Sequence, residues 1–131
     1  MKLLLDTHIL AWAGTRPEKL THRVRRELQR RDNELHLSPV SMWEAEHLGR
    51  RGRLHIKQTF TEWIEEMLAA LPVREAPFTF AVGVEASRIQ LPQADPGDVF
   101  LAATAVVYDL TLVTSDAQLL SCSWLKTLRN A

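Results

Sequence analysis

Two spacings of apolar residues alternate along this chain, and each predicts one kind of secondary structure. Short apolar runs, such as LLL before Asp6 and LTLVT before Ser115, predict buried strands. Apolar residues that recur every three or four positions predict helices, and Leu20, Val24 and Leu28 give one whose outer face carries arginines. The predicted strands are residues 2–6, 34–38, 73–76 (at a sheet edge), 110–114 and 125–128. The predicted helices are residues 7–13, 20–32, 41–52, 60–71, 80–89, 96–108 and 117–120.

The alternation of strands and helices predicts an α/β fold, in which helices cover both faces of a parallel sheet. In such a fold, the carboxyl ends of the strands and the amino ends of the following helices meet at one edge. Ligands bind beyond that edge. Residues at the strand-to-helix junctions are therefore the first candidates for chemistry.

Four carboxylates fall at these junctions. Asp6 ends the first strand and Asp116 follows the strand 110–114, whereas Glu44 and Asp98 lie in the first turns of two helices. Four acidic residues at one edge repel each other unless cations enter, and hard divalent cations prefer oxygen ligands. The sequence therefore predicts an Mg²⁺ or Mn²⁺ site that activates a water for attack on a phosphodiester.

Each of these carboxylates also has a purely structural interpretation, which the sequence leaves open. Ser41 and Glu44 have the spacing of a capping box, in which Glu44 bonds back to the helix start. Asp95 and Asp98 suit a helix amino terminus. Asp116 and Asp6 precede helices that they could cap. Each acidic residue is a weak signal alone, and their shared edge is the stronger argument.

Composition narrows the class of protein. With 131 residues, 46% of them hydrophobic, the chain is expected to form one domain over residues 1–131. The formal net charge is zero, but residues 1–60 are rich in Lys and Arg and residues 61–131 in Asp and Glu. The only cysteine is Cys122, which excludes an internal disulfide and favours the reducing cytoplasm. We expect no signal peptide and no membrane span, because the longest apolar run, residues 100–108, is far shorter than about 20 residues.

Other chemistry has less support in the sequence. The five histidines lack zinc-ligand spacing, HExxH is absent, and no glycine-rich loop precedes a helix. The tryptophans at 12, 43, 63 and 124 lie in or beside apolar stripes, which favours core packing. Arg50, Arg51 and Arg53 form a basic cluster that either contacts RNA phosphates or is merely solvated.

With these residues in view, the chain resembles a PIN-domain protein, specifically a VapC-like toxin of a type II toxin–antitoxin pair. LLLDTHILAWA resembles the opening strand of that family with its first acidic residue. SPVSMWEAEHLGRRGRL resembles its Ser-x-x-Ser-x-Trp-Glu segment, ADPGDVFLAATA its Asp-Pro-x-Asp helix start, and LTLVTSD its final strand and acidic residue. The four segments together, in this order, span essentially the whole chain.

The resemblance implies a three-layer α/β/α sandwich around a parallel sheet of four or five strands. It also implies Mg²⁺- or Mn²⁺-dependent endoribonuclease cleavage of transfer or ribosomal RNA. The implied catalytic and metal-binding residues are Asp6, Glu44, Asp98 and Asp116, with Asp95, Thr7 and Ser115 as candidates for support. The chain departs from the family at Gly97 and Val99, where Phe and Arg are common, and in lacking a Lys in the helix after Glu44.

The resulting prediction is a cytoplasmic ribonuclease toxin that forms a homodimer and is silenced by a cognate VapB-like antitoxin. One alternative is a catalytically idle PIN domain that binds RNA or protein. Another is a different metal-dependent phosphohydrolase, such as a haloacid-dehalogenase-like enzyme. That class has Asp-x-Asp after its first strand, whereas this chain has Thr7 and His8 after Asp6.

Overall fold

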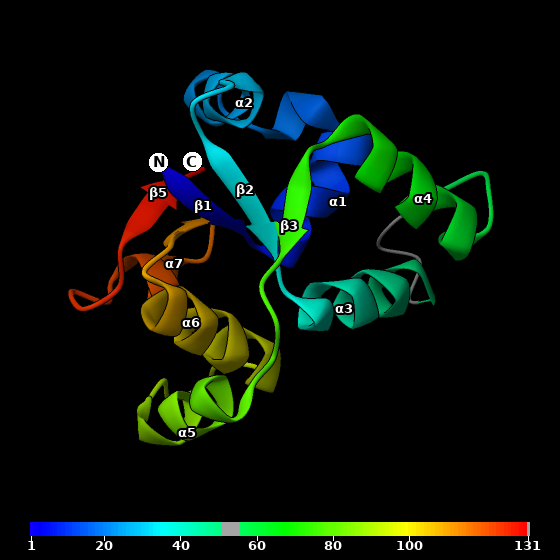
Figure 1. Cartoon of the computed structure of the whole chain (residues 1–131). Coiled ribbons are helices and arrows are strands. Elements are labelled where there is room, and N and C mark those ends of the chain that lie inside the picture. Colours follow the sequence, from blue (N-terminus) through cyan, green and yellow to red (C-terminus); the bar gives the residue numbers. More distant parts are fainter. Residues whose placement is uncertain (51–55, 131) are drawn as a thin grey trace.

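The computed structural model describes residues 1–50 and 56–130 and has a five-stranded parallel sheet at its centre (Figure 1). The sheet has the order β3-β2-β1-β4-β5, with β3 at one edge as predicted. All four strand pairs are parallel. The strands are β1 (Lys2–Leu5), β2 (Glu34–Leu37), β3 (Val73–Glu75), β4 (Thr111–Thr114) and β5 (Thr127–Arg129). The predicted α/β class with a parallel sheet is confirmed.

Helices cover both faces of this sheet. Successive side chains of a strand point to opposite faces, so Leu3 and Leu5 of β1 pack with α1, α2 and α4, while Leu4 packs with α6 and α7. Helix α5 lies outside α6 (Figure 1). The helices are α1 (Thr7–Thr15), α2 (His22–Gln29), α3 (Pro39–Arg50), α4 (Phe60–Ala70), α5 (Phe80–Arg88), α6 (Pro96–Tyr108) and α7 (Ala117–Leu120). None of these described helices is both long enough and apolar enough to cross a membrane.

Several element boundaries differ from the sequence prediction, and the helix predicted over residues 20–32 is shorter at both ends, since α2 spans only His22–Gln29. Helix α1 continues to Thr15 and is followed by a short 3₁₀ turn, η1 (Pro17–Lys19), that was not predicted. Helix α3 begins at Pro39 and not at Ser41, because proline suits a first helical turn and the Ser38 hydroxyl accepts the Val40 N–H. The last strand begins at Thr127 and not at 125, since Leu125 is buried in the turn before the strand.

The chain reverses its direction across the sheet next to β1. From β1 it moves outward through β2 to β3, then returns to place β4 and β5 on the other side of β1. In open α/β sheets, ligands bind at the carboxyl edge where the strand order reverses. The carboxyl ends of β1 and β4 are therefore the expected location of a site.

Candidate functional site

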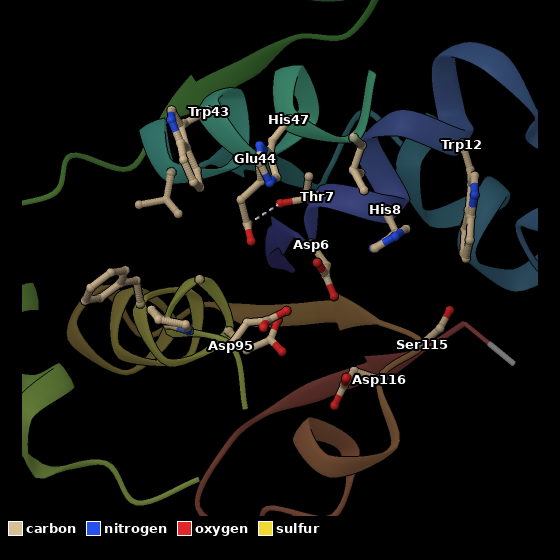
Figure 2. Close-up of a pocket in the computed structure, with 16 residues that line it drawn as sticks. Asp6, Thr7, His8, Trp12, Trp43, Glu44, His47, Asp95, Ser115 and Asp116 are labelled. Carbon is tan, nitrogen blue, oxygen red and sulfur yellow. Dashed lines mark hydrogen bonds between the residues drawn. The ribbon is translucent and has the colours of Figure 1, made fainter. Parts of the chain in front are cut away.

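A cleft of about 820 Å³ opens at this carboxyl edge (Figure 2). Its walls come from the starts of α1 and α6, from α3, and from the turn between β4 and α7. Seven residues predicted from the sequence line it: Asp6, Thr7, Glu44, Asp95, Asp98, Ser115 and Asp116. The structure thus brings together carboxylates that are up to 110 positions apart in the chain.

Asp6 is held at the base of the cleft by a threonine. Its side chain is only 7% exposed, and the Thr114 hydroxyl donates to Asp6 Oδ2 at 2.6 Å. The same hydroxyl accepts the Asp116 N–H at 3.0 Å, so Thr114 links two acidic residues. Burial raises the pKa of Asp6, and the Thr114 hydrogen bond opposes that rise. Asp6 occupies the N-cap position of α1 without a capping side-chain bond, so the capping interpretation of Asp6 is wrong.

Thr114 was missed by the sequence prediction. The available signal was its position as the last residue of the best-defined strand, two residues before Asp116. In a parallel strand at a sheet centre, that last inward side chain reaches the ligand edge.

Glu44 reaches into the cleft from the second turn of α3. The Thr7 hydroxyl donates to Glu44 Oε1 at 2.7 Å and lies 3.1 Å from the Ser41 Oγ. Burial, and then the charges of Asp6 and Asp95, raise the pKa of Glu44, whereas the Thr7 bond lowers it. The predicted capping box is wrong, because α3 begins two residues before Ser41 and the Glu44 carboxylate bonds to Thr7.

Gly97 gives the Glu44 carboxylate the space that it occupies. A Cβ atom at position 97 would overlap both the Oε2 and the carboxyl carbon of Glu44. A side chain at position 97 would displace this carboxylate, whereas glycine leaves it in place. The departure of this chain from the family at Gly97 therefore has a structural reason.

Asp98 faces the other carboxylates from the first turn of α6. Its pKa is raised to about 7, first by burial and then by the charges of Asp6, Asp116, Glu44 and Asp95. Asp95 precedes α6 at the N-cap position but makes no capping side-chain bond. The electrostatics thus couple all five carboxylates in one cleft.

Asp116 combines two structural features. It lines the cleft, and its Oδ1 accepts the Leu119 N–H at 2.9 Å, so it caps α7 as the structural interpretation predicted. The neighbouring Ser115 hydroxyl donates to the Asn130 carbonyl at 2.6 Å, and the Asn130 amide donates back to Ser115 Oγ at 3.0 Å. Ser115 therefore ties the cleft wall to the end of β5.

The donor set of the cleft fits a hydrated divalent ion. Within residues 1–50 and 56–130, no three or more His, Cys, Asp or Glu side chains are close enough together to hold a metal ion as a caged site. Mg²⁺ does not need such a cage, because it usually binds through one or two carboxylates and keeps several waters. Burial, and then the charges of the neighbouring carboxylates, raise the pKa of Asp98, so a cation in the cleft would favour its ionised form. A metal site formed by Asp6, Glu44, Asp98 and Asp116 stays a prediction.

Of the predicted arginine cluster, the structure describes Arg50, the last residue of α3. Arg50 is exposed and its Nε forms an ion pair with Glu46 Oε1 at 2.6 Å. Arg51 and Arg53 lie outside the described residues.

Aromatic residues of the cleft were not predicted as site residues. Trp12, Trp43, His8 and His47 line it beside the carboxylates. Core packing is confirmed for Trp63, which is buried, but is wrong for Trp43 and Trp124, which are 66% and 48% exposed. Helical periodicity identifies apolar positions, but not which of them a neighbouring element covers.

Comparison with known proteins gives one consistent result. The model of the PIN domain family matches residues 3–124. The chain is 29% identical over 122 residues to Ribonuclease VapC22 of Mycobacterium tuberculosis, covering 91% of this chain and 90% of the relative. Two solved structures share the fold over 98% of both chains. VapBC2 from Rickettsia felis, bound to a DNA fragment from its promoter, has a TM-score of 0.69 and 19% identity. VapBC-5 from Mycobacterium tuberculosis, a member of the VapBC family of toxin–antitoxin systems, has a TM-score of 0.65 and 12% identity.

Proposed function

The chain belongs to the PIN domain family, and from this premise we propose that it is an Mg²⁺- or Mn²⁺-dependent endoribonuclease. The observation that carries the proposal is the convergence of Asp6, Glu44, Asp98 and Asp116 in one cleft. The similarity to Ribonuclease VapC22 supports RNA as the substrate. Transfer or ribosomal RNA is the expected target.

The residues of the cleft have distinct tasks in this proposal. Asp6, Glu44, Asp98 and Asp116 would hold a divalent ion, which would polarise the phosphate of the substrate and make a water acidic enough to act as nucleophile. Asp6 and Glu44 offer carboxylates that Thr114 and Thr7 hold in place. Asp98, whose pKa burial and the neighbouring carboxylates raise to about 7, would be a third ligand for such an ion in its ionised form.

Asp95 and Asp116 complete the acidic cleft. Asp95 is exposed at its rim and adds negative charge that raises the pKa values of Glu44 and Asp98. Asp116 is fixed by its bond to the Leu119 N–H, so its second carboxylate oxygen can face the ion. Arg50, Arg51 and Arg53 are proposed to contact RNA phosphates.

We further propose that the protein is a cytoplasmic toxin with a cognate VapB-like antitoxin, whose tail fills the acidic cleft, and that it forms a homodimer. The shared fold with VapBC2 and VapBC-5 supports this pairing. Membership of the PIN domain family excludes the haloacid-dehalogenase-like alternative. The remaining alternative is a catalytically idle PIN domain that binds RNA or protein, and an RNA cleavage assay distinguishes it from a ribonuclease.

The proposal is tested by RNA cleavage with purified protein. We expect cleavage with Mg²⁺ or Mn²⁺, none in excess EDTA, and poor cleavage with Ca²⁺, whose looser coordination positions a water less well. Asp6→Asn and Glu44→Gln should lose more than the roughly 10- to 100-fold that removing an outer partner of a metal ligand costs.

Asp109→Asn is the matched control. Asp109 is an acidic residue that does not line the cleft: it lies at the C-cap of α6, where it pairs with Lys126. Asparagine tolerates the left-handed conformation of this residue, so cleavage should be unchanged. RNA cleavage that persists in EDTA, or an active Asp6→Asn variant, would contradict the metal mechanism.

A further inference from the structure

A large aromatic side chain stands exposed at one end of the cleft. Trp43 lines the cleft and is 66% exposed. Its helix α3 buries the opposite face, through Ser41 and Ala45, so Trp43 projects away from the core. An exposed ring of this size forgoes the burial that usually stabilises tryptophan. Its position is therefore a candidate for a binding role.

The Trp43 ring stacks on the ring of His47, which lies in the next turn of the same helix. Residues four positions apart lie on the same helix face, and the Trp43 and His47 rings stack at 5.3 Å with an interplanar angle of 9°. Both residues line the same cleft as the carboxylates. The pair forms a preformed aromatic platform beside Glu44.

The other tryptophan of the cleft is arranged differently. Figure 2 shows Trp12 at the opposite end from Trp43, with Asp6 and Glu44 between them. The Trp12 ring is tilted by 53° to His8 and lies 5.5 Å from the Lys19 ammonium. Trp12 thus already packs against a cation, whereas Trp43 presents a ring that is mostly exposed.

We propose that Trp43, backed by His47, stacks on an unpaired nucleobase next to the scissile phosphate and so contributes to the selection of RNA by this cleft. This inference rests on the proposed ribonuclease function. The phosphate must lie at the carboxylates, so the adjoining bases meet the walls of the cleft. A cleft with five carboxylates repels a polyanion. Stacking supplies affinity without charge, and every base has a face for it.

The geometry favours unpaired RNA over a duplex. In a duplex both faces of each base are already stacked, and the protein contacts the backbone instead. A splayed base in a loop offers its face to an aromatic ring. The platform therefore selects loops or single strands.

The test measures RNA binding separately from cleavage. An Asp98→Asn background prevents cleavage, and fluorescence anisotropy follows a labelled 12-nucleotide single strand and the same strand in a duplex. We expect Trp43→Ala to weaken single-strand binding roughly 5- to 150-fold and to leave duplex binding unchanged. Trp43→Phe should retain most of the affinity. The single strand should also quench tryptophan emission in the parent protein but much less in Trp43→Phe.

Trp124→Ala is the matched control, because Trp124 is also exposed but lies outside the cleft. It should bind both RNAs as the parent does. Equal binding by Trp43→Ala and the parent would overturn the inference. An equal loss in single-strand and duplex binding would also overturn it. Cleavage by the unmodified chain is assayed separately, so a protein that stacks RNA without cutting it would refute only the proposed function.

Discussion

The carboxylate of Glu44 lies directly over the backbone of Gly97, and this single contact can be tested. We expect Gly97→Ala to push the carboxylate aside, since a Cβ would overlap it. Cleavage should fall by about 10- to 100-fold, as when a metal ligand loses its orienting partner. Stability should be unchanged or higher, because alanine favours a helix by up to about 1 kcal/mol over glycine and the displaced atoms end a flexible side chain. Cleavage rates and urea unfolding of the same preparation provide the measurement.

Gly83→Ala gives the matched control for this prediction. Gly83 lies inside α5, and a Cβ there would meet nothing within 4 Å. The variant should be more stable by a similar amount and fully active. An equally active Gly97→Ala would mean that the position of the Glu44 carboxylate does not matter for the reaction.

At the scale of single elements, the sequence could not separate capping from site chemistry. Acidic residues suit helix amino termini for either reason, and the structure gives each a different answer. Asp6 and Asp95 occupy N-cap positions without capping bonds, whereas Asp116 does cap its helix. Glu44 lost its predicted capping role because α3 begins at Pro39. A shift of two residues in a helix start, below the precision of sequence patterns, decided that outcome.

Because Asp116 both lines the cleft and caps α7, two substitutions of it should differ in stability but not in activity. Asp116→Asn keeps a good N-cap residue, so stability should hold while cleavage is lost. Asp116→Ala also removes the bond to the Leu119 N–H and should cost about 0.5–2 kcal/mol in addition. Urea unfolding in EDTA, paired with the cleavage assay, distinguishes the two effects.

Thr59→Ala is the control at this scale. Thr59 caps α4 by accepting the Glu62 N–H at 3.2 Å and does not line the cleft. Its replacement should lower stability to a similar degree with cleavage intact. A fully active Asp116→Asn would reduce Asp116 to a capping residue.

At the scale of the whole molecule, alternating patterns were enough to predict the sheet, its parallel strands and the edge that carries the site. The order of strands around β1 then places α1 and α3 opposite α6 and the α7 turn, so that carboxylates from both halves of the chain meet in one cleft. The aromatic wall could not be predicted in this way. Whether Trp43 is covered depends on how α3 is rotated against its neighbours, which no local pattern records.

The charge of the cleft makes stability depend on pH through Asp98. Its pKa is about 7 in the folded protein and near 3.8 when unfolded. The folded state therefore binds the extra proton between these values, so this group lowers stability as pH rises from about 4 to 7. Asp98→Asn cannot titrate. In EDTA, it should match the parent near pH 4 and be more stable than the parent above pH 7.

With a bound divalent ion, the parent should instead be more stable than Asp98→Asn above pH 7. Only the ionised carboxylate is a ligand, so Mg²⁺ should stabilise the parent increasingly as pH rises through 7, by about 2.7 kcal/mol at 100 times its Kd. Asp98→Asn should gain less from Mg²⁺ at every pH.

Asp109→Asn is the control, and its effect on stability in EDTA should have the opposite sign. The hydrogen bond and charge of Lys126 lower the pKa of Asp109, so the ionised Asp109 slightly stabilises the fold at neutral pH and this contribution is lost on acidification. Thermal melts from pH 4 to 8, with and without Mg²⁺, measure all three proteins. An Asp98→Asn variant that is less stable than the parent at pH 8 in EDTA would identify Asp98 as a helix-start residue, because relief of repulsion between close carboxylates can only raise stability there.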